Sequence, residues 1–135
     1  MRIVCATLLG LALCAGARAG DLTIEIDGVT SAQGQLMVTL YRDAGTYLKS
    51  GRQQAGPAVA GRAVLVIKDV APGEYAFALY HDANGNGKLD ANLIGIPTEA
   101  YAFSNDAKAV MGPPAFDAAR FAVPAEGRTL RVAMQ

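Results

Sequence analysis

Oxygen-bearing side chains recur at alternate positions in one short stretch, residues 82–90. Counted from its first residue, the oxygen donors at positions 1, 3, 5 and 9 are Asp82, Asn84, Asn86 and Asp90. Gly87, at position 6, permits the sharp turn that wraps such a loop around one point. Because Ca²⁺ takes about six to eight oxygen ligands, this spacing is typical of a calcium-binding loop.

The ligand set from this stretch alone is incomplete. The backbone carbonyl of Lys88, at position 7, would add one ligand, but Leu93 stands at position 12, where an EF-hand has a bidentate Glu. An isolated EF-hand is therefore not expected, and another segment or water must complete the shell. The nearby oxygen donors are Asn92, Glu99 and Asp106.

A turn without an ion is the alternative for the same residues. The dipeptides Asn84-Gly85 and Asn86-Gly87 are both hairpin-turn signals, because Asn and Gly tolerate positive φ. A turn needs only one such dipeptide, whereas this segment has two and is flanked by Asp82 and Asp90. We therefore predict a structural Ca²⁺ site formed by Asp82, Asn84, Asn86, Lys88 and Asp90.

Catalytic chemistry has less support. His81 is the only histidine, and neither a Gly-x-Ser-x-Gly motif nor any other nucleophile motif accompanies it. It is predicted to be a packed imidazole that braces the loop, with a general base or an extra ligand as the alternative. The carboxylates of Asp82, Asp90 and Glu99 could form a glycosidase-like pair, but a cation that neutralises them is favoured. We predict that the protein is not an enzyme, with a metal-assisted hydrolase as the alternative.

A cluster of apolar residues follows the loop. It comprises Tyr101, Phe103, Met111, Pro113, Pro114 and Phe116. These residues either line an apolar or carbohydrate-stacking groove or cover the open end of the fold.

The N-terminal residues indicate export. Arg2 precedes an apolar run over residues 3–13, and Ala17-Arg18-Ala19 is a small-x-small cleavage site. We predict a signal peptide over residues 1–19 and a domain over residues 20–135, periplasmic or secreted. A lipoprotein cysteine at Cys14 is disfavoured by the bulky Leu13 before it. No stretch is long enough to predict a membrane span.

Cysteine and charge exclude several classes of function. Both cysteines, Cys5 and Cys14, lie in the predicted signal peptide, so disulfides, thiolate metal sites and cysteine nucleophiles are not expected. Without Arg2 and Arg18, 10 basic residues face 12 acidic ones, a net charge of −2. With no basic run and no Trp, nucleic-acid binding is not expected.

Short segments of alternating polarity, separated by Gly, Pro and Asn turn signals, dominate the rest of the chain. The predicted strands cover residues 22–27, 35–42, 63–67, 74–81, 99–103, 118–123 and 128–135. Asp43 is predicted to cap a short helix over residues 43–49, and residues 50–61 are predicted to be a mobile loop. The pattern predicts an all-β fold, a single antiparallel β-sandwich of about seven strands with at most one short helix.

Individual side chains can be assigned to faces of these strands. Phe121, Val123, Leu130, Val132 and Met134 should point inward and Arg131 outward. Tyr75 follows a Pro-Gly turn at a strand start, a placement similar to the tyrosine corner of immunoglobulin-like domains, or else it is a core aromatic.

The order of these motifs is similar to that of a bacterial family of exported proteins, domain of unknown function 2141. The motifs are Pro72-Gly73-Glu74-Tyr75, the run from His81 to Asp90, Ile94-Gly95-Ile96-Pro97-Thr98-Glu99, Tyr101-Ala102-Phe103-Ser104-Asn105 and Gly112-Pro113-Pro114-Ala115-Phe116. The resemblance implies an immunoglobulin-like or prealbumin-like sandwich and no established activity. The loop also resembles calcium loops in the repeat B domains of Gram-positive surface adhesins.

Together these features predict an exported domain that acts as a binding or structural module, with Ca²⁺ fixing one end loop. Two alternatives stay open: a carbohydrate- or protein-binding module without metal, and the hydrolase.

Overall fold

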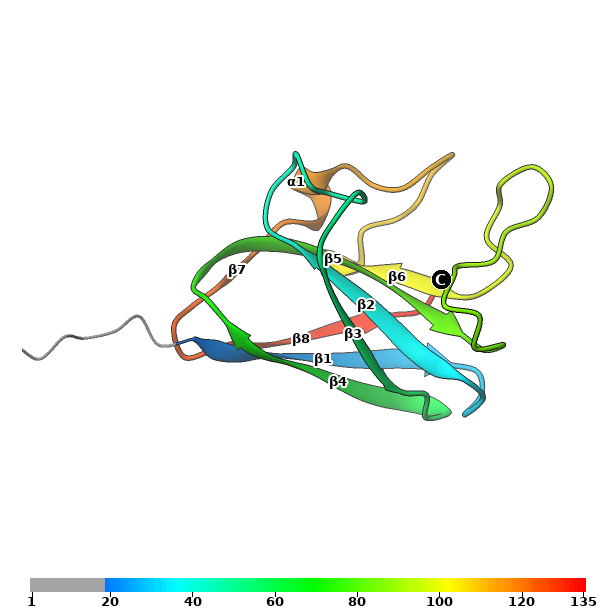
Figure 1. The fold of residues 1–135 in the computed structure, drawn as a ribbon, viewed down its shortest axis with the longest axis horizontal. Coiled ribbons are helices and arrows are strands. Elements are labelled where there is room, and N and C mark those ends of the chain that lie inside the picture. The colour runs from blue at the N-terminus through cyan, green and yellow to red at the C-terminus, as the bar shows by residue number, and fades with distance from the viewer. Residues whose placement is uncertain (1–18) are drawn as a thin grey trace, which may run out of the picture.

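The computed structural model describes residues 19–135, which form a two-sheet β-sandwich, as predicted (Figure 1). The predicted signal peptide, apart from Ala19, and both cysteines lie outside the described residues. The strands are β1 (Gly20–Val29), β2 (Gln35–Tyr41), β3 (Arg52–Pro57), β4 (Gly61–Val70), β5 (Gly73–Asp82), β6 (Tyr101–Phe103), β7 (Phe121–Val123) and β8 (Arg128–Ala133). Two short helices, η1 (Ser104–Asp106) and α1 (Phe116–Ala119), complete the fold.

One sheet has three strands in the order β4-β1-β8, and the other has five. The path of the five-stranded sheet is β3-β2-β5-β6, and β7 also pairs with β5. Figure 1 shows the two sheets as separate layers, with β1, β4 and β8 beneath β5 and β6. Since β5 pairs with β2, β6 and β7, it is the strand to which most of its sheet is attached.

The β1–β8 pair is parallel, which departs from the predicted antiparallel sandwich. After β7 the chain crosses from the five-stranded sheet to the three-stranded sheet, close to the first residues of β1. β8 therefore starts next to the start of β1 and runs in the same direction, from Leu22↔Arg128 to Asp27↔Ala133. A side chain at Gly20 would overlap the backbone of Gly127, and Gly127 has φ 85°. The close crossing therefore depends on two glycines.

The core lies between the sheets and follows the predicted alternation. On β1, Leu22, Ile24 and Ile26 are fully buried. The rings of Phe77 and Phe121 meet edge to face at 5.7 Å, and burying each such side chain contributes roughly 1.5–3 kcal/mol. Phe121, Val123 and Val132 are buried, which confirms that they point inward as predicted. Leu130 and Met134 are partly buried and pack against the same core.

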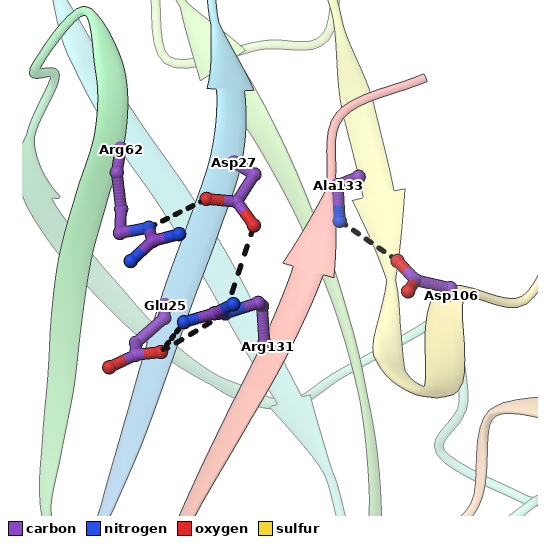
Figure 2. Close-up of polar contacts among 6 residues, drawn as sticks. All are labelled: Glu25, Asp27, Arg62, Asp106, Arg131 and Ala133. Carbon is purple, nitrogen blue, oxygen red and sulfur yellow. Dashed lines mark hydrogen bonds and ion pairs between the residues drawn. The ribbon is translucent and has the colours of Figure 1, made fainter.

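The outer face of the three-stranded sheet carries a ladder of ion pairs (Figure 2). Arg131 on β8 lies 3.1 Å from Glu25 and 3.8 Å from Asp27 on β1, and Arg62 on β4 lies 2.7 Å from Asp27. Arg131 therefore points outward, as predicted. Because these side chains are partly exposed, each pair contributes at most about 1 kcal/mol.

The predicted loop over residues 50–61 is wrong, because β3 forms there. Residues 52–57 pair antiparallel with β2, from Leu40↔Arg52 to Gln35↔Pro57. Backbone hydrogen bonding to β2 overrides a local sequence rich in Gln, Gly and Pro. The Arg52 guanidinium also donates to the carbonyls of Lys68 and Asp69, which joins β3 to the opposite sheet.

The predicted helix over residues 43–49 is a series of turns instead. Asp43 caps it as predicted, since Oδ1 accepts the Thr46 N–H (2.8 Å) and the Thr46 hydroxyl (2.9 Å). These bonds hold the pKa of Asp43 below its ordinary value. Leu48 then takes φ 59°, a left-handed conformation that ends any helix. The short helix is α1, which overlaps the start of the strand predicted over residues 118–123.

Tyr75 fits both of its predicted interpretations. Its hydroxyl donates to the carbonyl of Ala71 four residues upstream (2.7 Å), the bond that defines a tyrosine corner. The ring also packs against the core.

Ser104 joins three elements at the edge of β5. Its buried Oγ accepts the Phe77 N–H (3.0 Å) and donates to the carbonyl of Ala119. The hydroxyl thus satisfies backbone groups between the points where β6 and β7 pair with β5.

Ser104→Ala should therefore lower the free energy of unfolding by about 1–3 kcal/mol, because it leaves buried backbone groups without partners. Urea unfolding measures this loss, and Ser50→Ala, at an exposed position, should change stability by less than about 0.5 kcal/mol. Equal effects of the two substitutions would contradict the role assigned to Ser104.

Candidate metal-binding loop

The loop is held at both ends by the pairing of β5 with β6. The N–H of His81 donates to the carbonyl of Ala100 (2.9 Å), so the chain leaves and re-enters the sheet at neighbouring positions. Inside the loop, the Thr98 N–H donates to the carbonyl of Asp90 (2.8 Å). Figure 1 shows this segment projecting beyond the end of β5.

Asp82, the last residue of β5, has a completely buried side chain. Its Oδ1 accepts the Asn86 N–H (3.1 Å), and its Oδ2 accepts the Gly87 N–H (2.8 Å). Gly87 has φ 74°, so the sharp turn predicted at this glycine is present. The backbone therefore curls around the Asp82 carboxylate.

The remaining predicted side chains meet at Asp90. The Asn86 amide donates to Asp90 Oδ1 (2.7 Å), and the Asn84 amide donates to Asp90 Oδ2. The Oδ1 atoms of the same two asparagines accept backbone N–H groups two residues ahead, from Asn86 (3.2 Å) and Lys88 (2.9 Å). The structure thus brings the predicted oxygen donors into one compact loop.

Of the three extra donors predicted nearby, Glu99 alone bonds to the residues of the predicted site. Its Oε2 accepts the Ala83 N–H (2.9 Å), and its Oε1 accepts the Asp90 N–H (3.0 Å), so one carboxylate joins both ends of the loop. Asn92 instead accepts N–H groups within its own turn. Asp106 lies beyond the other end of β6 and accepts the Ala133 N–H at 2.8 Å (Figure 2).

The carboxylates of the loop are not paired with a basic side chain, although Lys88 lies in the same loop. Within residues 19–135, none of Asp82, Asp90 and Glu99 forms an ion pair with Lys or Arg. The pKa of Tyr80 is raised, first by burial and then by these same three carboxylates. A cation would relieve this concentration of negative charge.

The donor chemistry fits calcium better than a transition metal. Across the described residues, no three His, Cys, Asp or Glu side chains converge to hold a metal ion. A cation here would rely also on amide and carbonyl oxygens, which are ligands that Ca²⁺ accepts and zinc sites rarely use. Each Asn carbonyl oxygen that accepts one N–H keeps a second lone pair, so these internal bonds leave coordination open.

His81 and the turn before β2 support the base of the loop. The imidazole is 3% exposed, and its Nε2 donates to the carbonyl of Gln33 (2.6 Å), so the predicted packed imidazole is confirmed. A side chain at Gly34 would overlap the carbonyl of Asp82. The sequence signals only a turn at Gln33-Gly34, and the contact with the loop was therefore missed.

The tip of the loop presents aliphatic side chains, a feature that sequence reasoning also missed. Asn92 Oδ1 accepts the N–H groups of Ile94 (3.1 Å) and Ile96 (3.0 Å), which shapes a tight turn. Leu93 is fully exposed, and Ile94 is 80% exposed.

The predicted aromatic cluster is divided between two places. Tyr101 meets Phe103 with ring centroids 5.9 Å apart, and Phe103 is buried. Phe116 meets Tyr47 at 5.7 Å, and the Tyr47 hydroxyl donates to the carbonyl of Pro114 (2.9 Å). The aromatic residues predicted as one cluster therefore pack in two separate pairs, Tyr101 with Phe103 and Phe116 with Tyr47.

The fold and site define a class: a two-sheet β-sandwich whose central strand leads into a loop rich in Asp and Asn. The family model described as an uncharacterized protein conserved in bacteria (DUF2141) matches residues 24–131, and the chain belongs to this family. The resemblance noted in the sequence is thereby confirmed. No curated protein and no solved structure gives a significant match to the chain. Among the described residues, no helix has both the length and the apolar character to cross a membrane.

Glu99→Ala should loosen the loop without disturbing the sheets, because it frees the N–H groups of Ala83 and Asp90. Hydrogen exchange should accelerate by about tenfold or more at those amides, as expected for the loss of a hydrogen bond to a charged group. Exchange in residues 76–80 of β5 should stay unchanged, and Glu126→Ala provides the matched control. Unchanged protection of the loop would contradict the role assigned to Glu99.

Proposed function

We propose that this bacterial β-sandwich is an exported, non-catalytic binding or structural module in which Ca²⁺ stabilises the loop from Asp82 to Asp90. The observation that carries the proposal is the gathering of four Asp and Asn side chains, with Glu99 beside them and no Lys or Arg paired to the carboxylates among the described residues. Carboxylates held together in this way repel one another unless a cation neutralises them.

The residues that would hold the ion are Asp82, Asn84, Asn86, Asp90 and the carbonyl of Lys88, with Glu99 as a further oxygen donor. When bound, the ion supplies positive charge and cross-links oxygen atoms from successive turns of the loop. Extracellular calcium modules bind in the range of about 10⁻⁴ to 10⁻³ M, and a ligand set from one short loop favours that weak end. The site would then fill where external calcium is plentiful.

The exposed tip supports a binding role for the stabilised loop. Leu93 and Ile94 stand on a turn that begins two residues after Asp90, so a rigid ion site would fix how they are presented. Apolar side chains held outward in one arrangement lose less conformational entropy when a protein or carbohydrate partner covers them.

The surroundings of His81 favour a module without catalysis. Its Nε2 is already bonded to the carbonyl of Gln33 and the ring is buried, whereas a general base must reach a substrate proton. The carboxylates of Asp82 and Glu99 likewise accept backbone N–H groups, and that of Asp90 accepts the side-chain amides of Asn84 and Asn86.

Calcium should raise the melting temperature of residues 20–135. At about 100 times its dissociation constant, the ion adds roughly 2.7 kcal/mol to the free energy of unfolding, and Mg²⁺ should add less because it dehydrates reluctantly. Calorimetry in EDTA and then in millimolar CaCl₂ or MgCl₂ measures the difference.

Asp82→Asn and Asp90→Asn should each remove most of the calcium-dependent rise. Asp117→Asn is the matched control, since Asp117 is exposed on α1 and distant from the loop in sequence. Melting curves of the unmodified protein that coincide with and without calcium would exclude a stabilising ion and leave the loop as a plain turn.

Export predicts a processed N-terminus. Expression of the full chain in a bacterial host should yield a protein that begins at Gly20 and is released by osmotic shock, as a signal peptidase cleavage after Ala19 requires. Ala19→Arg should block processing. A full-length chain retained in the cytoplasm would refute the exported location.

A further inference from the structure

A cleft of about 490 Å³ opens at the end of the sandwich where β5 begins, whereas the candidate metal-binding loop starts at Asp82, where β5 ends. Its walls come from both sheets and from the turns between β2 and β3. The lining residues include Arg42, Ser50, Arg52, Asp69, Ala71 and Tyr75. This volume lies within the range of about 300–1,000 Å³ typical of sites for small ligands.

Two lining residues carry opposite charges that the protein does not pair. Within residues 19–135, neither the Arg42 guanidinium nor the Asp69 carboxylate takes part in an ion pair. Arg52 differs, because its guanidinium is committed to the carbonyls of Lys68 and Asp69. The cleft therefore offers one unpaired cation in the turn that follows β2 and one unpaired carboxylate on β4 of the other sheet.

The walls are fixed by contacts that do not involve those two charged groups. The Tyr75 hydroxyl bonds to Ala71 O (2.7 Å), and Thr46 is bonded to Asp43. A side chain at Gly51 would lie 2.5 Å from the carbonyl of Leu40, so the backbone of the turn packs directly against β2. A site whose frame is already rigid loses little entropy on binding.

Asp69 itself is in an unusual conformation. Its φ is 55°, in the left-handed region that non-glycine residues rarely adopt, and Arg52 holds its carbonyl there (3.2 Å). The Asp69 N–H also donates to Asp21 Oδ1 (3.3 Å), so the backbone of this lining residue is fixed from both sides.

We propose that this cleft binds a small sugar acid, a molecule with one carboxylate and several neighbouring hydroxyls. Arg42 receives the carboxylate, because a guanidinium donates two parallel hydrogen bonds to it. Asp69 accepts hydrogen bonds from the hydroxyls, and Ser50 adds a neutral donor and acceptor. The cleft is independent of the calcium loop, so it binds equally in EDTA and in calcium.

The test is a titration of ¹⁵N-labelled residues 20–135, which contain both sheets and the whole described core, followed by two-dimensional NMR. The probe is D-glucuronate, and the comparison ligands are D-glucose, acetate and inorganic phosphate. Glucuronate should shift the amides of Ser50, Gly51 and Ala71 saturably, with an affinity about tenfold or more above that of any comparison ligand, since it alone satisfies both charged residues.

Substitutions separate the two contacts. Arg42→Gln should weaken glucuronate binding by about tenfold or more, whereas Lys49→Gln, which removes the same charge from the same turn, should leave it unchanged. Asp69→Asn should weaken glucuronate but not acetate, because acetate has no hydroxyl and is repelled by Asp69. An unchanged reference spectrum shows that each variant is folded.

Several results would overturn the proposal. No saturable shift up to 20 mM glucuronate, or equal binding by the Arg42→Gln variant, would show that the cleft does not recognise a carboxylate. Equal affinity for phosphate would show a site for any anion and exclude the sugar acid. Equal affinity for glucose would exclude the role of the carboxylate.

Discussion

The buried carboxylate of Asp82 constrains the whole loop-bearing end of the molecule. A carboxylate removed from water is tolerated only when hydrogen bonds or opposite charge replace its hydration, and Asp82 is completely buried at the end of β5. The N–H groups of Asn86 and Gly87 meet its two oxygens, and to do so the chain must fold back sharply. That reversal draws Asn84, Asn86 and Asp90 together, so the geometry of the candidate site follows from one buried group.

The sandwich positions this carboxylate through β5. Because β5 pairs with β2, β6 and β7, its last residues are fixed from more than one side (Figure 1). The β1–β2 turn adds support through the bond between His81 and Gln33 and through the close contact at Gly34. At the other end of the same strand, Tyr75 and the Arg52 contacts frame the polar cleft. One strand thus places the candidate ion-binding loop at one end and the polar cleft at the other.

Local patterns in the sequence predicted most of the strands and the Asp and Asn residues that gather in the loop. Alternation along the chain assigned β1, β2, β5 and β8, since burial on one face imposes a period of two, and a short apolar run rich in β-branched residues assigned β4. β3 was missed because an edge strand with little burial has no such period, and its hydrogen bonds to β2 come from distant residues. The parallel β1–β8 pair likewise depends on where the chain crosses between sheets, which no local pattern records.

In the candidate site, too, features set by one short segment were predictable and features set by distant contacts were not. The alternate spacing of Asp82, Asn84 and Asn86 was readable because all three lie in one short segment. Asp106 was also predicted as a donor, yet it lies past the other end of β6 and bonds to Ala133. Glu99 and Asp106 are both acidic residues shortly after the loop in sequence. Because Glu99 precedes β6 and Asp106 follows it, the course of β6 leaves Glu99 beside the loop and carries Asp106 away from it. Arg42 and Asp69 are 27 positions apart and come together only through the packing of two sheets.

A crystal structure of residues 20–135 grown in millimolar CaCl₂ would test the proposed ion site most directly. The account predicts one strong anomalous peak in the loop, about 2.3–2.6 Å from oxygens of Asp82, Asn84, Asn86 and Asp90 and from the Lys88 carbonyl. An ordered loop without such a peak, with the amides of Asn84 and Asn86 still bonded to Asp90, would contradict it.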